Sequence, residues 1–210
     1  MPIQQTEENN SNQIAPAEWM ESWKTVSDKL LHKIVYDYFY YMGYGSTLEI
    51  YCKEHNVPYK PNPIFEIRSK IRSEIESGNI ELAREGLIDF DIELIDNDFD
   101  LNYFLLSHKA IELVNNENEV EVLDYISQVI HPMTQKNKIE SLKDVLEYLV
   151  FKTGDDIQKK RYKLASFVNT KIIEKYETTE NLIKSIVNAI IDGEGKLSKK
   201  YKFPLFEEYL

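Results

Sequence analysis

The chain has 210 residues, of which 42% are hydrophobic and 29% charged, a balance that is ordinary for a globular protein with a buried core. Its formal net charge of -11 repels phosphate backbones and argues against a nucleic-acid partner. A single cysteine, Cys52, excludes an internal disulfide and a cysteine-rich zinc site, and it fits a reducing compartment such as the cytoplasm or the nucleus.

The first segment, residues 1–17, is polar and rich in Gln, Asn and Glu. It lacks the apolar centre of a signal peptide, and no stretch of the chain approaches the length of a membrane span. We therefore expect a disordered tail and no membrane contact.

Helical periodicity begins at residues 30–42, where apolar side chains recur on one face. Gly43 is expected to end this helix in the left-handed conformation. Ser46 and Glu49 predict a capping box that opens a short second helix, which residues 55–58 end. A helical hairpin of this size cannot bury its own apolar stripe, so it must pack on something else.

The same periodicity continues after a proline-rich joint at residues 58–63. We expect helices at 64–75, ended by Gly78, and at 80–87, 101–114, 120–130, 139–150 and 164–172, with Pro132 stopping the fourth of these six. A last helix begins at a Thr179 cap and ends at residues 192–195, before an aromatic tail. The acidic run at 89–100 is interpreted as a solvated face or a loop with helix-capping roles. No segment alternates like a strand, so the predicted class is all-α.

Residues that could carry catalysis are sparse. The four histidines include no pair at the spacing that places two metal ligands on one helix face. The glycine pairs at 43–45 and 193–195 do not follow strands and are interpreted as helix stops, and the acidic run lacks the central glycine of a calcium loop. We expect no catalytic, cofactor or metal site and no enzymatic activity.

The first two predicted helices carry a more specific pattern. It resembles the LisH motif, a helical hairpin known as a dimerisation unit, with Leu48 where the family commonly has Ala and Tyr51 where it has Phe. The resemblance implies a dimerisation surface made by Leu31, Ile34, Val35, Tyr38, Phe39, Gly43, Tyr44, Thr47, Leu48, Tyr51 and Glu54. Charged substitutions at Ile34 and Phe39 are expected to weaken oligomerisation and to leave helix content largely intact.

The next segment resembles the CTLH domain, which is found C-terminal to LisH. The resemblance rests on an Arg, Ile, Ile, Gly, Ile, Ala, Leu series that starts at Arg68 and on a second signature around residues 101–114, where His108 stands in place of a common Gln. It implies a core or partner-binding face that includes Arg68, Ile71, Ile75, Gly78, Ala83, Leu105, Ile111, Glu112 and Leu113. Residues 119–203 resemble the CRA region, most clearly at 142–151 and 168–172.

The order LisH, CTLH and CRA resembles the glucose-induced degradation protein 8 family over nearly the whole chain. The corresponding ranges are a tail at 1–17, LisH with its N-terminal extension at 18–58, CTLH at 59–118 and CRA at 119–210. The resemblance implies a non-catalytic scaffold of the GID, or CTLH, ubiquitin-ligase complex, which acts in protein degradation and links RING-containing subunits to substrate receptors.

Further partners implied by the resemblance are SPRY-type and other LisH–CTLH subunits. The C-terminal helices are expected to fold back toward LisH and to form a homo- or heterodimer surface with it. An oligomerisation module of a cytoskeletal or transcriptional-repressor assembly stays open as the alternative, although such relatives generally carry a further large domain.

Overall fold

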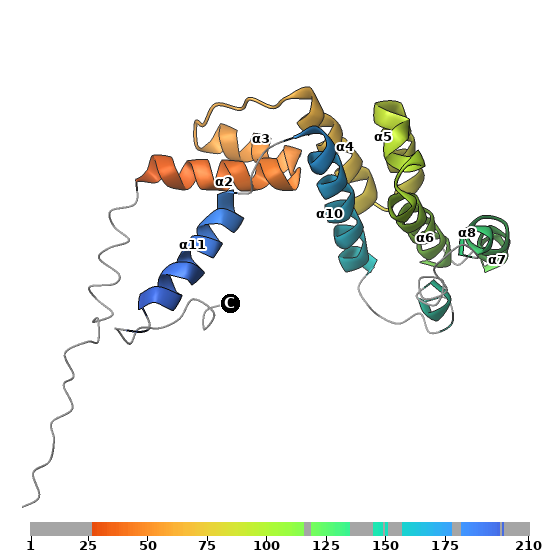
Figure 1. The fold of residues 1–210 in the computed structure, drawn as a ribbon. Coiled ribbons are helices and arrows are strands. Elements are labelled where there is room, and N and C mark those ends of the chain that lie inside the picture. The colour runs from red at the N-terminus through yellow and green to blue at the C-terminus, as the bar shows by residue number, and fades with distance from the viewer. Residues whose placement is uncertain are drawn as a thin grey trace, which may run out of the picture. The chain divides into compact units, whose positions relative to one another are not determined.

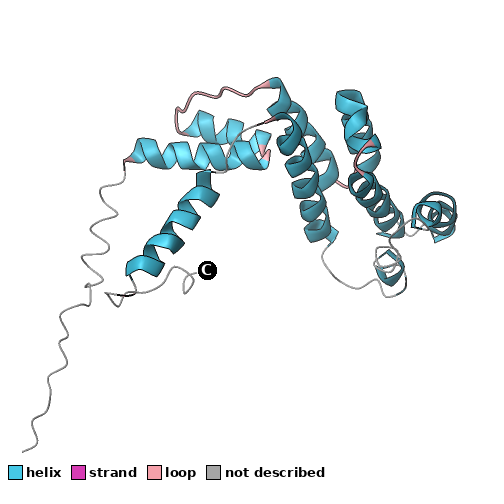
Figure 2. Cartoon of the chain, in the orientation of Figure 1, coloured by secondary structure: helices cyan, strands magenta, loops and turns pink. Residues whose placement is uncertain are grey.

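The computed structural model describes residues 27–115, 119–134, 145–148, 150, 157–177, 182–197 and 199. Every regular element in these ranges is a helix, as Figure 2 shows, so the predicted all-α class is confirmed. The chain divides into two compact units, one made by residues 1–41 with 180–210 and the other by residues 42–179. The described residues of the first unit, 27–41, 182–197 and 199, thus come from distant parts of the sequence.

The first unit contains α11 (Leu182–Leu197) and all but the last residue of α2 (Asp28–Met42). Neither helix contains a buried residue. Both are amphipathic, with apolar residues repeated at helical spacing, so each presents an apolar stripe that is at most partly covered.

The second unit contains the remaining described helices, of which Figure 1 labels α3 to α8 and α10. α4 packs against both α5 and α10, α5 packs against α6, and α3 packs against α4. α6 also contacts α7 and the π-helical turn η1. The bounds are α3 (Gly45–Glu54), α4 (Pro63–Glu76), α5 (Ile80–Asp96), α6 (Phe99–Asn115), α7 (Glu119–Tyr125), η1 (Ile126–Ile130), α8 (His131–Thr134) and α10 (Ile157–Tyr176).

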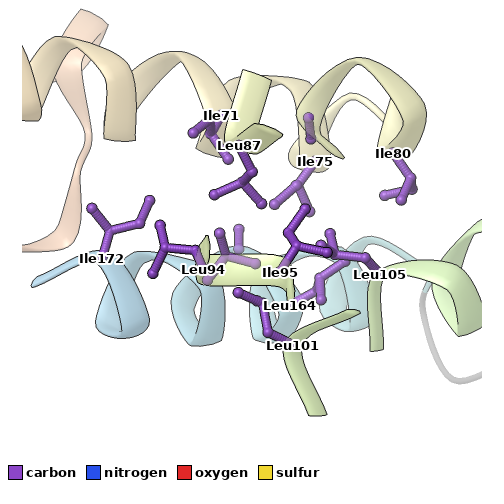
Figure 3. Packing of buried hydrophobic residues seen from close by; sticks show 13 residues of the cluster. Ile71, Ile75, Ile80, Leu87, Leu94, Ile95, Leu101, Leu105, Leu164 and Ile172 are labelled. Carbon is purple, nitrogen blue, oxygen red and sulfur yellow. The ribbon is translucent and has the colours of Figure 1, made fainter. Parts of the chain in front are cut away.

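Two hydrophobic cores stabilise the second unit. The larger one lies among α4, α5, α6 and α10, and Figure 3 shows its side chains meeting between these helices. It contains Ile71, Ile75, Ile80, Ala83, Leu87, Leu94, Ile95, Leu101, Leu105, Leu164, Ala165, Val168 and Ile172. The smaller one joins α6 to η1 and to the described residues near 145–148, and it contains Tyr103, Ala110, Ile111, Val114, Val122, Ile126, Ile130, Val145 and Tyr148.

Several helix ends follow directly from local sequence. Asn62 caps α4 by accepting a hydrogen bond from the Phe65 N–H at 2.6 Å, and Pro63 occupies the first turn, where a missing N–H is tolerated. Gly43 and Gly78 have φ angles of +77° and +84°, so both predicted glycine stops are confirmed. At Gly78 the full Schellman pattern is present, because the next N–H bonds to the Glu74 carbonyl at 2.8 Å.

Three predicted boundaries were wrong. α3 begins at Gly45 with Tyr44 at its N-cap position, so Ser46 does not form the expected capping box. Pro132 does not stop its helix, because the preceding turn is π-helical and the chain stays helical to Thr134. α11 continues through Gly193 to Leu197, since glycine lowers helix stability without forbidding the helical conformation.

The acidic run is helical, with a kink and two capping aspartates. Asp91 is extended inside α5, at φ -164° and ψ 102°, and its carboxylate accepts from the Glu93 N–H at 3.0 Å. Asp98 accepts from the Leu101 N–H at 3.0 Å at the start of α6. The predicted capping roles are thus confirmed, and each carboxylate also contacts a lysine of α10, Lys175 and Lys171 respectively.

Some predictions concern residues outside those that the structure describes. They are the tail at 1–17, the Thr179 cap, the aromatic C-terminal segment and most of the helix at 139–150, of which 145–148 and 150 are described and helical. Among the described helices, none is both long and apolar enough to cross a membrane.

Candidate interaction surface

None of the predicted LisH residues on α2 is buried. Leu31 is 47% exposed and Tyr38 is 37% exposed, while Ile34, Val35 and Phe39 are partly buried. Large aliphatic and aromatic side chains at this exposure leave apolar area in contact with water. The stripe on α2 is therefore partly exposed to water in the isolated chain, and its role in dimerisation stays a prediction.

The predicted residues on the turn and α3 divide into an inner and an outer set. Gly43 and Leu48 are buried, together with Cys52, and Tyr44 and Tyr51 are partly buried. The outer side of α3 exposes Thr47 and Glu54, and also Ile50, which is 58% exposed. One face of α3 thus packs within the second unit, and the opposite face reaches solvent.

Ser69 of α4 holds the start of α3. The Gly45 N–H donates to the Ser69 hydroxyl at 3.0 Å, which supplies the acceptor that the Tyr44 side chain does not provide. A methyl group at Gly45 would lie 2.1 Å from the Ser69 Oγ and 2.8 Å from its Cβ, so the approach requires a glycine. The first turn of α3 is therefore capped by a neighbouring helix.

Arg72 of α4 holds the residue before that glycine. Its guanidinium lies 4.2 Å from the Tyr44 ring centre and donates to the Tyr44 hydroxyl at 3.0 Å. It also donates to Ser166 of α10 at 3.2 Å and pairs with Glu76, Nε to carboxylate oxygen, at 2.8 Å. A buried cation thus connects the turn, α4 and α10.

Arg68, one helical turn earlier, is fully buried. It donates to the Asn169 side-chain oxygen at 2.6 Å and to both carboxylate oxygens of Glu177, at 3.1 and 3.3 Å. A Cβ added to Gly43 would come within 2.9 Å of the same Asn169 oxygen. Because a buried charge is tolerated only when it is paired and hydrogen-bonded, this cluster fixes α4, α10 and the turn in one arrangement.

Most of the predicted CTLH residues lie in or against the hydrophobic cores of the second unit. Ile71, Ile75, Ala83 and Leu105 belong to the larger core, Ile111 belongs to the smaller core, and Leu113 packs against the smaller core. These positions support the packing of the domain, and which surface a partner contacts stays a prediction.

Glu112 and Gly78 meet at a second polar cluster. The Arg161 guanidinium of α10 makes two 2.7 Å bonds to the Glu112 carboxylate, and these bonds raise the pKa of Arg161. A Cβ on Gly78 would lie 2.5 Å from the Arg161 Nη2. Gly78 therefore leaves room for the ion pair that joins α6 to α10 and also ends α4.

Sequence reasoning did not identify the residues that complete these clusters. Ser69, Arg72, Arg161 and Glu177 each pair with a residue that was singled out, but their partners are distant in the chain, by 24 residues for Ser69 and Gly45 and by 109 residues for Glu177 and Arg68. Arg68 and Arg72 repeat at helical spacing inside the apolar face of α4. This pattern is the signal that could have indicated the clusters.

Titratable groups in the second unit serve packing. Burial raises the pKa of the Cys52 thiol, which favours the unreactive protonated form. Burial lowers the pKa of His108, whose Nδ1 lies 2.9 Å from the Phe104 carbonyl oxygen. No group of three or more metal-binding side chains occurs among the described residues.

The chain is similar to known proteins over most of its length. Residues 64–206 match the family described as CTLH/CRA C-terminal to LisH motif domain. The chain is 22% identical over 212 residues to glucose-induced degradation protein 8 homolog from Nematostella vectensis, covering 94% of each protein. It is 23% identical to protein GID8 homolog from Arabidopsis thaliana, covering 91% of this chain and 84% of the relative. It is 27% identical over 143 residues to the Dictyostelium discoideum homolog, covering 66% of this chain and 63% of the relative.

Proposed function

The chain belongs to the family of CTLH/CRA domains that lie C-terminal to LisH motifs, and we propose that it is a non-catalytic scaffold subunit of the GID, or CTLH, ubiquitin-ligase complex. The observation that carries this proposal is the similarity to glucose-induced degradation protein 8 homologs over more than 90% of the chain in two of the relatives. The helical surfaces and the lack of a recognisable reaction site among the described residues support a role in protein contact.

In this proposal the catalytic work belongs to other subunits. The chain has one cysteine, which cannot supply the paired zinc sites of a RING domain. RING-containing subunits, SPRY-type subunits and other LisH–CTLH subunits are the partners that the chain would join, in the cytoplasm and the nucleus. Its ranges 18–58, 59–118 and 119–210 would act as LisH, CTLH and CRA.

The dimerisation surface of this scaffold would include the apolar stripe of α2. Support comes from the absence of any buried residue on α2 and from the exposed Leu31 and Tyr38, and α11 of the same unit has no buried residue either. That Thr47 and Glu54, which α3 of the second unit exposes, also contact the partner stays a prediction.

Light scattering tests the dimerisation surface. Ile34→Glu and Phe39→Glu are expected to lower the molar mass of the purified chain toward that of a monomer, because each places a charge in the apolar contact. Lys33→Glu, at an exposed position of the same helix, is the matched control and should leave the mass unchanged. Equal masses for all four proteins would remove α2 from the interface.

Affinity purification of the tagged full chain tests the complex. Mass spectrometry of the eluate is expected to identify RING-containing subunits, and ubiquitin transfer should require those subunits. Recovery of cytoskeletal or repressor proteins without ubiquitin transfer would instead support the alternative oligomerisation role.

A further inference from the structure

The outward side of α5 exposes two large aliphatic residues that its packing does not use. Leu82 is 54% exposed and Ile92 is 53% exposed. The residues that attach α5 to its neighbours include Ile80, Leu87, Leu94 and Ile95, which Figure 3 labels in the larger core. Because the core side of α5 is complete without them, Leu82 and Ile92 are unpartnered apolar residues on the outward side of the helix, one before and one after the kink at Asp91.

Charge is concentrated around the same helix. Residues 80–100 contain eight acidic residues and one basic residue, Arg84, and so hold seven of the chain's eleven net negative charges. Lysines 109, 171 and 175 pair with four of these acids, Glu81, Asp91, Glu93 and Asp98. Glu85, Asp89 and Asp96 are exposed and make no ion pair with any residue that the structure describes.

This charge pattern does not stabilise α5 itself. Glu81, Glu85 and Asp89 follow one another at intervals of four residues, so neighbouring like charges repel along one side of α5. The last turn contains acidic residues and no basic residue, which opposes the helix dipole. A cationic partner would relieve both effects, and local rules are broken in this way most often at functional surfaces.

We propose that the outward face of α5 binds a segment of a partner protein that is rich in Lys and Arg and carries an aliphatic or aromatic residue. The cations would lie against Glu85, Asp89 and Asp96, and the apolar side chain would cover Leu82 and Ile92. The charge defines the class of occupant, because only a positively charged segment is complementary to this face. Contact with Leu82 and Ile92 would add a short-range apolar interaction to the attraction between opposite charges.

A synthetic amphipathic peptide of lysine and leucine at helical spacing is the probe, and its binding to the full chain is followed by fluorescence anisotropy. At an ionic strength of roughly 0.15 M, Glu85→Lys/Asp89→Lys is expected to weaken binding about tenfold or more. Asp124→Lys/Glu147→Lys makes the same change in net charge at exposed positions elsewhere in the second unit, and it should change the affinity less than about twofold.

The aliphatic contact has its own control. Leu82→Ser/Ile92→Ser keeps every charge and is expected to weaken binding by about fivefold, whereas Val120→Ser, at a residue that is 74% exposed, should have no effect. Equal weakening by the two charge variants would show non-specific attraction and overturn the proposal. An unchanged affinity for the serine pair would also overturn it. Circular dichroism checks that all variants keep their helix content, and the result does not depend on membership in a ligase complex.

Discussion

The contact between Gly45 and Ser69 tests whether packing or helix propensity decides how a glycine substitution changes the free energy of unfolding. In an exposed helix, Gly→Ala stabilises by about 0.5–1 kcal/mol. At Gly45 the new methyl would lie 2.1 Å from the Ser69 Oγ, so α3 and α4 must separate. Overpacking of this kind costs about 1–3 kcal/mol, and displacing the capping hydroxyl adds about 1 kcal/mol.

We therefore expect Gly45→Ala to lower the free energy of unfolding by about 2 kcal/mol, which for a chain of this size corresponds to a Tm lowered by roughly 4–8 °C. Urea denaturation of the full chain, followed by circular dichroism, measures the change. Gly193→Ala is the matched control, because nothing lies within 4 Å of a methyl at that position of α11. It should leave stability unchanged or raise it slightly.

A double-mutant cycle isolates the clash. Ser69→Gly removes both atoms that the new methyl would meet, and by itself it should destabilise by about 1.5–2 kcal/mol through the lost cap and the added glycine. Gly45→Ala/Ser69→Gly should then be no less stable than Ser69→Gly alone, with an interaction energy of about 2 kcal/mol. Simple addition of the two single effects would refute the steric reasoning.

Three further predictions concern the buried and capping groups. Arg68→Met leaves the Glu177 carboxylate buried without its cation and should destabilise by about 3–5 kcal/mol, and adding Glu177→Leu should recover at least half of this in urea titrations. Burial lowers the pKa of His108, so this side chain takes up a proton at a higher pH in the unfolded chain than in the folded chain. The free energy of unfolding should therefore decline below about pH 6.5, and His108→Gln should reduce that decline. Burial opposes ionisation of Asp98, but bonds from Lys171 and the Leu101 N–H outweigh it and lower the pKa. Its stabilisation should be present above its ordinary pKa of 3.8 and be lost as the pH falls through the lower folded value, and Asp98→Asn should abolish this acid dependence in thermal melts.

Local signals predicted those features that depend on a few adjacent residues. The spacing of Ile80, Ala83 and Leu87 placed all three in the core, where they are buried. Gly78 ends its helix as expected because the left-handed conformation that follows a helix is a local requirement.

Features that depend on distant residues could not be predicted in this way. Ser46 looked like an N-cap, yet the N-cap position of α3 is Tyr44, two residues earlier, because a hydroxyl on another helix satisfies the Gly45 N–H. Arg68 was identified through a family pattern, but its partners Asn169 and Glu177 follow from the way that α4 and α10 pack. The exposure of Leu82 likewise follows from which side of α5 its neighbours cover.

The capping of α3 by Ser69 also bears on the order in which the chain folds. The first amide of α3 finds its acceptor only after α4 is in place, so this helix is expected to consolidate after α4 and not independently of it. In the native protein the Gly45 amide hydrogen should exchange with solvent only when the two helices part. A single amide proton therefore reports, on the timescale of hydrogen exchange, the opening of the contact between α3 and α4.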